Sequence, residues 1–225
     1  MLPRPFGPYR LLRRLGQGGL AEVHLALAFG ASGFEKRIAI KTLLPELRGD
    51  GPSEKLLIDE ARLAASLQHR GLVQVHDLGI CEGQYFVRLE YVDGADLQAL
   101  LRAAPPPPAL ALLIGEELAY ALDFVHRHPD DRGRPLGLVH RDVSPANVLL
   151  SRAGEVKLGD FGVAKATHLQ DHTRAGVRKG KYAYMSPEQI SGDDLSGQSD
   201  LFSLGVLLCE LLLGRRPFDA DPGST

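Results

Sequence analysis

Glycines interrupt an apolar run near the N-terminus, at residues 15–23 (LGQGGLAEV). Glycine at a turn lets backbone N–H groups approach phosphate oxygens without a side chain in the way. Ala21 departs from the GxGxxG pattern, and a strand rather than a helix is expected after the turn. Both points argue against a dinucleotide fold and against a Walker P-loop. Taken alone, such a segment is more often only a turn.

Lys41 and Glu60 stand where a charged side chain is costly. Lys41 follows Ile38-Ala39-Ile40 at the end of an apolar strand, and Glu60 lies within the apolar face of an expected helix. A buried ammonium or carboxylate is unfavourable unless it is paired. Each residue taken alone is better explained as an exposed side chain. Mutual neutralisation would account for both positions at once, and it becomes the favoured explanation only with the motifs found further along the chain.

The elements that must position these residues change in character along the chain. Residues 9–42, 72–80 and 84–92 read as strands joined by turns, and a helix is expected to start at Pro52-Ser53. Beyond this, helical patterns at 95–102, 110–126 and 199–213 enclose two short strands. We place the boundary near residue 93, which gives domains at 1–93 and 94–225.

Composition limits the possible functions. The 225 residues are 44% hydrophobic and can form a substantial core. The net charge of −2 gives no general attraction to nucleic acid or anionic lipid, so a nucleic-acid-binding module is disfavoured. Cys81 and Cys209 form no metal or disulfide motif, which fits a cytoplasmic protein. The longest apolar stretch, Leu201 to Leu213, is short and contains Glu210, so no membrane span is expected.

Further motifs follow in a fixed order. Residues 140–147 (HRDVSPAN) precede 160–162 (DFG), 184–188 (YMSPE) and 200–205 (DLFSLG). With the glycine-rich segment, Lys41 and Glu60, they resemble the catalytic elements of the protein kinase family. The resemblance covers residues 9 to about 218 and is greatest to bacterial, eukaryotic-like Ser/Thr kinases.

The resemblance implies an α+β, bilobal fold. The N-terminal lobe would be an antiparallel sheet with helix C, followed by a hinge at 90–93. The C-terminal lobe would be mainly helical and incomplete after helix F. The implied activity is transfer of the γ-phosphoryl group of Mg-ATP to a serine or threonine hydroxyl of a protein. Arginines typical of tyrosine kinase catalytic loops are missing.

The resemblance also implies roles for single residues. Lys41, held by Glu60, would bind the α- and β-phosphates, and Asn147 and Asp160 would bind Mg²⁺ through oxygen atoms. Asp142 would accept the proton of the substrate hydroxyl or orient that hydroxyl. Leu89 would be the gatekeeper, and the residues expected at ATP are Leu15, Gly16, Gly18, Val23, Ala39, Lys41, Glu90, Val92, Asp96 and Leu149.

The catalytic loop, residues 140–147, departs from the family at Ser144, where Ser/Thr kinases usually have a lysine that contacts the γ-phosphate. Lys181 stands where they usually have threonine. One hypothesis is that Lys181 supplies the missing charge as a catalytic residue. The alternative, rated about equal, is a solvent-facing lysine.

Arg141 next to Asp142 resembles kinases whose activation segment is ordered by phosphorylation. Thr173 is the first candidate for autophosphorylation and Thr167 the second, and ordinary loop threonines are the alternative. Arg174, Arg178 and Lys179 could select acidic substrates or form a solvated face.

The chain ends soon after the expected helix F, where the family has further helices. We therefore expect Glu188 of the APE-like element to lack its usual arginine partner and helix F to expose apolar surface. The rival to an active kinase is a pseudokinase or ATP-binding scaffold, or an inactive kinase fragment. Membrane attachment of a longer parent protein stays open.

Overall fold

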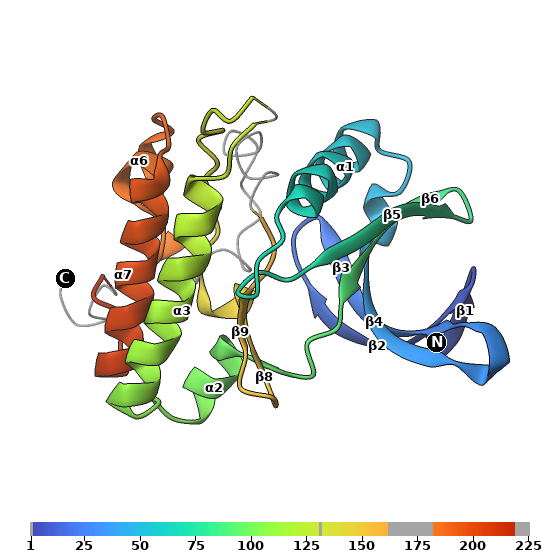
Figure 1. Cartoon of the computed structure of the whole chain (residues 1–225), viewed down its shortest axis with the longest axis horizontal. Helices are drawn as coiled ribbons and strands as arrows, with labels where there is room; N and C mark the ends of the chain where they lie inside the picture. Colours follow the sequence, from blue (N-terminus) through green and yellow to red (C-terminus); the bar gives the residue numbers. More distant parts are fainter. Residues whose placement is uncertain (1, 131, 162–181, 219–225) are drawn as a thin grey trace. The chain divides into compact units, whose positions relative to one another are not determined.

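The computed structural model describes residues 2–130, 132–161 and 182–218 (Figure 1). Contacts divide the chain into two compact units. The first comprises Met1–Gln68 and Val73–Tyr91, and the second comprises His69–Leu72 and Val92–Thr225. The short segment His69–Leu72 thus belongs with the C-terminal elements, which its position in the sequence did not indicate. The domain bounds 1–93 and 94–225 stay a prediction.

The first unit is built on a six-stranded antiparallel sheet. Its strand order is β1-β2-β3-β4-β6-β5. The bounds are β1 (Arg4–Phe6), β2 (Tyr9–Gln17), β3 (Ala21–Phe29), β4 (Glu35–Leu43), β5 (Val75–Cys81) and β6 (Gln84–Glu90). Short 3-10 turns, η1 (Ala31–Gly33) and η2 (Pro45–Leu47), follow β3 and β4.

One helix, α1 (Gly51–Ser66), accompanies this sheet (Figure 1). It begins slightly before the Pro52-Ser53 start expected from the sequence, because the Asp50 side chain caps it by accepting a hydrogen bond from the Ser53 N–H at 3.0 Å. Leu57 and Ala61 of α1 pack with Leu43 and Val87 of the sheet.

A second hydrophobic cluster packs strands β1 and β2 against more distant strands of the same sheet. Phe6 of β1 meets Phe86 of β6 edge to face, with ring centroids 5.4 Å apart. The cluster consists of buried residues from several strands: Phe6, Tyr9, Leu11, Ala26, Ile38, Ile40, Cys81 and Phe86. The two clusters together fix the sheet and α1 as one body.

The second unit contains a small sheet and several helices. The sheet has the order β7-β8-β9. The bounds are β7 (Gly94–Asp96), α2 (Leu97–Ala103), α3 (Pro108–His126), η3 (Pro145–Asn147), β8 (Val148–Ser151), β9 (Val156–Leu158), α6 (Pro187–Ser191) and α7 (Gly197–Leu213).

Strands β7 and β8 approach closely at Gly94. A Cβ atom there would lie 1.8 Å from the Leu150 carbonyl oxygen, so only glycine permits this pairing. The resulting register places Asp96 opposite Leu149.

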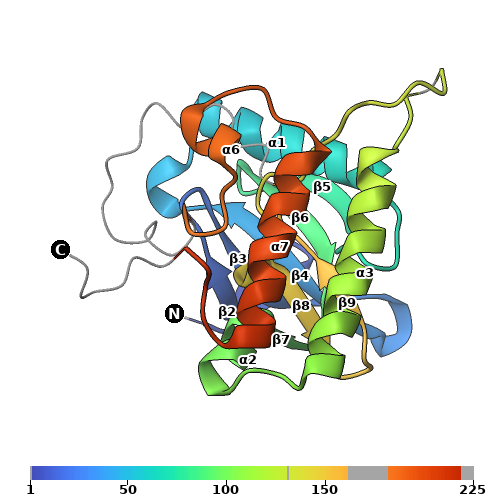
Figure 2. The ribbon, with the colours of Figure 1, turned by 90° about the vertical axis from the view of Figure 1, so that its left-hand side faces the viewer.

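Helices α3 and α7 lie side by side (Figures 1 and 2). Gly115 of α3 allows the approach, since a Cβ there would already lie 3.2 Å from Leu208 of α7. Three leucines of α7 that do not face the core, Leu201, Leu212 and Leu213, are exposed. Helix α7 contains the residues expected to form helix F, so the apolar surface expected on that helix is confirmed. None of the described helices is both long and apolar enough to cross a membrane.

Candidate active site

Lys41 of β4 and Glu60 of α1 form a direct ion pair. Their Nζ and Oε1 atoms are 2.7 Å apart, and the two side chains are 11% and 12% exposed. This confirms the ion pair, which the motifs further along the chain favoured over two exposed side chains. It holds an ammonium in a fixed position on the sheet.

Strand register brings other predicted nucleotide-binding residues beside Lys41. Gly16 of β2 pairs with Val23 of β3, which pairs with Lys41 of β4. Ala39, two residues before Lys41 on the same strand, faces the same side of the sheet. The turn between β2 and β3 is closed by a 2.8 Å hydrogen bond from the Gly18 N–H to the Ala21 carbonyl.

The remaining predicted nucleotide-binding residues lie at several places. Leu15 is exposed on β2, and Glu90 ends β6 and donates its N–H to the Gln74 carbonyl at 2.9 Å. Val92 begins the main segment of the second unit. Asp96 caps α2 by accepting from the Ala99 N–H at 2.7 Å, so part of its carboxylate already has a structural task.

Asn147 ties the catalytic loop to the segment that carries Asp160. Its Nδ2 donates to the Asp142 carbonyl at 2.8 Å, and its backbone carbonyl accepts from the Gly159 N–H at 2.9 Å. Asn147 and Asp160, the predicted metal ligands, are therefore brought close together. Their amide and carboxylate oxygens are ligands that Mg²⁺ prefers.

No group of three or more His, Cys, Asp or Glu residues suited to a metal ion occurs in the described part of the chain. Two protein oxygen ligands nevertheless fit Mg²⁺, because this ion keeps several waters and is completed by substrate phosphates. The donor set therefore fits a metal that arrives with a nucleotide.

Two residues of this region have left-handed backbone conformations. The φ angles of Arg141 and Asp160 are 70° and 55°. For a residue with a side chain this conformation costs roughly 1–3 kcal/mol, and such strain gathers at functional sites. Nearby, the rings of His140 and Phe161 are buried together with centroids 4.6 Å apart.

The Asp200 carboxylate of α7 organises the backbone before Asp142. It accepts hydrogen bonds from the His140 N–H at 2.7 Å and the Arg141 N–H at 2.8 Å, and lies 2.8 Å from His126 Nε2. Asp200 is 1% exposed, so these partners replace the water that its charge would otherwise need. The sequence placed Asp200 in a motif, but its contacts with the loop, and those of His126, were missed.

Ser144 occupies the position at which the resemblance to Ser/Thr kinases leads one to expect a lysine. Its hydroxyl is buried, and no described residue offers it a hydrogen bond. Lys181, Thr167 and Thr173 lie outside the described residues, as does the basic run that contains Arg178.

Glu188 of α6 has a partner that the sequence did not predict. The Ser199 hydroxyl of α7 donates to its carboxylate at 2.5 Å, and this bond holds the pKa of Glu188 below its ordinary value. Tyr184 makes two further contacts with α7. Its hydroxyl contacts the Glu210 carboxylate, and its carbonyl accepts a hydrogen bond from Ser203 Oγ at 2.7 Å. Tyr184 and Glu188 thus anchor the segment 184–188 (YMSPE) on α7.

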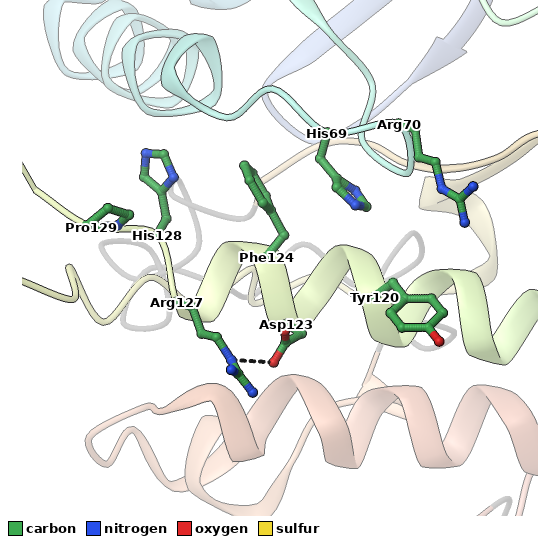
Figure 3. A pocket seen from close by; sticks show the side chains of 8 residues that line it. All are labelled: His69, Arg70, Tyr120, Asp123, Phe124, Arg127, His128 and Pro129. Carbon is green, nitrogen blue, oxygen red and sulfur yellow. Dashed lines mark ion pairs between the residues drawn. The ribbon is translucent and has the colours of Figure 1, made fainter. Parts of the chain in front are cut away.

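A surface pocket of about 540 Å³ lies elsewhere in the second unit (Figure 3). The His69 ring stacks on Phe124 of α3 at 5.0 Å, and Arg127 is paired with Asp123 at 2.7 Å. Its lining shares no residue with the predicted active site: His69, Arg70, Tyr120, Asp123, Phe124, Arg127, His128 and Pro129.

Known proteins with similar sequences are kinases. Tyrosine-protein kinase MasK of Myxococcus xanthus is 44% identical over 98% of this chain and 35% of its own length. Serine/threonine-protein kinase PknH of Mycobacterium tuberculosis is 37% identical over 98% of this chain and 34% of its own length. The chain thus spans about a third of the length of these curated relatives.

Solved structures agree with the sequence comparison. The crystal structure of the Mycobacterium tuberculosis PknI kinase domain matches 99% of this chain and 80% of its own, with 30% identity and a TM-score of 0.68. The family description "Protein kinase domain" matches residues 9–225. The expected fold, an antiparallel-sheet lobe followed by a helical lobe, is therefore confirmed, and the chain belongs to the protein kinase family.

Proposed function

We propose that this domain transfers the γ-phosphoryl group of Mg-ATP to a serine or threonine hydroxyl of a protein. The observation that carries the proposal is the buried 2.7 Å pair of Lys41 and Glu60, which keeps an ammonium ready for phosphate oxygens. A protein with no need to bind a polyanion gains little from a buried pair, because desolvating two charges offsets much of their attraction.

Each residue has a task that its geometry supports. Lys41 would bind the α- and β-phosphates, and Asn147 and Asp160 would hold Mg²⁺. When bound, this ion neutralises charge on the phosphates. Asp142 would orient the acceptor hydroxyl or take its proton. Because phosphoryl transfer needs little covalent work from the protein, fixing these groups in place supplies most of the rate enhancement.

The nucleotide would lie against the sheet residues on the side of Lys41. Gly16, Gly18, Val23 and Ala39 are proposed to contact it, together with Leu15, Glu90, Val92, Asp96 and Leu149. At Gly16 an added Cβ would meet nothing within 4 Å, so the space beside this backbone is open to a ligand. Gly16→Val would partly fill this space and should raise KM for ATP.

The names of the relatives point to two kinds of acceptor hydroxyl. The mycobacterial relatives are named serine/threonine kinases, which favours those hydroxyls, whereas the Myxococcus xanthus relative is named a tyrosine kinase. The name of this relative makes tyrosine a second candidate acceptor. Phosphoamino acid analysis after reaction with labelled ATP separates the two acceptors.

Lys181 and the two threonines give further tests. If Lys181 supplies the charge that Ser144 lacks, Lys181→Met should lower kcat strongly, and unchanged turnover would remove this role. Mass spectrometry after incubation with Mg-ATP should find phosphate on Thr173 or Thr167. An ATP-binding scaffold or an inactive fragment would bind nucleotide and incorporate no phosphate.

A further inference from the structure

Gln189 is a buried residue of α6 whose side chain forms hydrogen bonds in two directions. Its Oε1 accepts from the Ser186 N–H at 3.0 Å, while the Gln189 N–H donates to Ser186 Oγ at 3.3 Å. These two bonds form a capping box at the start of α6. Its Nε2 donates outside the helix, to the Arg141 carbonyl of the catalytic loop at 3.0 Å.

Arg141, whose carbonyl accepts this hydrogen bond, has a strained backbone conformation. Arg141 has a φ of 70°, and its N–H donates to Asp200 Oδ1 at 2.8 Å. Side chains from two helices therefore hold the peptide groups on both sides of Arg141: Asp200 from α7 and Gln189 from α6. A left-handed residue persists only when its surroundings fix it.

Asp142 follows directly on the peptide group that Gln189 holds. Rotation of that group would change the direction of the Asp142 side chain. Asn147 Nδ2 fixes the next peptide group by donating to the Asp142 carbonyl at 2.8 Å. Asp142 thus lies between two carbonyls that are each held by a side-chain amide.

We propose that Gln189 is a positioning residue for the reaction: it sets the orientation of Asp142 through the Arg141 carbonyl and links α6 to the catalytic loop. This inference rests on the proposed kinase activity. The link makes the placement of Asp142 depend on the conformation of the segment that leads into α6.

A capping role alone would explain only the bonds to Ser186, and one substitution separates the two roles. Gln189→Glu keeps an oxygen that accepts from the Ser186 N–H, as glutamate does in ordinary capping boxes. It has no N–H to donate, so a carboxylate oxygen would face the Arg141 carbonyl oxygen. Gln189→Met removes both functions, and Ser186→Ala weakens the cap while leaving the amide of Gln189 intact.

The first experiment compares steady-state kinetics and thermal unfolding of these variants with the parent chain. Gln189→Glu should lower kcat about tenfold, the factor expected for roughly 1.4 kcal/mol of lost transition-state stabilisation, and change KM for ATP less than about twofold. A carboxylate buried without a counter-charge is unfavourable, so the melting temperature of Gln189→Glu should also fall. The kinetics are therefore compared at a temperature at which every variant is fully folded. Gln189→Met should lower both kcat and melting temperature, and Ser186→Ala mainly the melting temperature. Parental kcat in Gln189→Glu would overturn the proposal.

A second measurement does not depend on activity. Amide hydrogen exchange at Arg141 and Asp142 should be faster in Gln189→Glu than in the parent, and unchanged in Ser186→Ala relative to its own global stability. Unchanged exchange in Gln189→Glu would overturn the positioning role. A parent chain that incorporates no phosphate would instead contradict the proposed function, and the exchange data would still test the link.

Discussion

Lys41 and Glu60 are 19 residues apart in the sequence, yet their charged atoms are 2.7 Å apart between strand β4 and helix α1. Both side chains are almost fully withdrawn from water. Removing one partner therefore takes away the counter-charge that lies 2.7 Å from the other buried charge. The Lys41 ammonium, which is predicted to act in catalysis, therefore also contributes to the stability of the first unit.

Lys41→Met should abolish phosphoryl transfer and lower the free energy of unfolding by about 3 kcal/mol, since Glu60 loses its counter-charge. Adding Glu60→Gln should recover part of this stability without recovering activity. Urea denaturation of both single variants and the double variant measures the coupling. Strictly additive losses would show that the two side chains do not stabilise each other in solution.

Gly197 and Gly205 of α7 should respond oppositely to alanine. A Cβ at Gly197 would lie 2.7 Å from His126 Nδ1, so Gly197→Ala should push this ring away from Asp200 and destabilise the chain. At Gly205 nothing lies within 4 Å of an added Cβ. Gly205→Ala should stabilise by about 0.5–1 kcal/mol, the usual gain in a helix interior.

Thermal unfolding of these two matched variants measures the difference. A Gly197→Ala chain as stable as the Gly205→Ala chain would contradict the described placement of His126. Activity gives a second readout for Gly197→Ala, because His126 contacts the carboxylate that holds the backbone before Asp142.

Stability should fall in mild acid because of His24. This residue is buried in β3, and burial is the main reason that its pKa lies below the usual 6.5. Glu22, whose carboxylate is 3.8 Å away, acts in the opposite direction, and nearby arginines add to the lowering: Arg4, Arg14 and Arg48.

The sign of the effect follows from proton binding. Below about pH 6.5 an unfolded histidine takes up a proton that the folded His24 resists, so the unfolded state gains stability as the pH falls. The slope for one proton is at most about 1.4 kcal/mol per pH unit. Replacing His24 by glutamine should flatten the dependence, measured by urea denaturation from pH 7.5 to 5. Identical slopes in the parent and the variant would refute this assignment.

The parts of the site that were predictable from the sequence are those with a local signal. Lys41 and Glu60 stand in apolar patterns where a lone charge is unfavourable, and the order of the motifs identified the family. The start of α1 was placed slightly late because Asp50, rather than Pro52-Ser53, provides the cap.

Hydrogen bonds between a side chain and a backbone group far away in the sequence could not be predicted from the sequence. Asp200 binds backbone N–H groups 59 and 60 residues away, and Gln189 binds a carbonyl 48 residues away. Every residue has such backbone groups, so the sequence does not show which are held. Glu188 was expected to lack its usual arginine partner, and the structure shows that the hydroxyl of Ser199 in the next helix donates to it.

Phosphate incorporation separates an active kinase from a domain that only binds nucleotide. The chain should be incubated with Mg²⁺, γ-labelled ATP and a mixed protein substrate, beside an Asp142→Asn variant whose nucleotide affinity is measured separately. We expect labelled serine or threonine with the parent chain, and nucleotide binding without label with Asp142→Asn. Equal labelling by both proteins, or none by a parent chain that binds Mg-ATP, would contradict it.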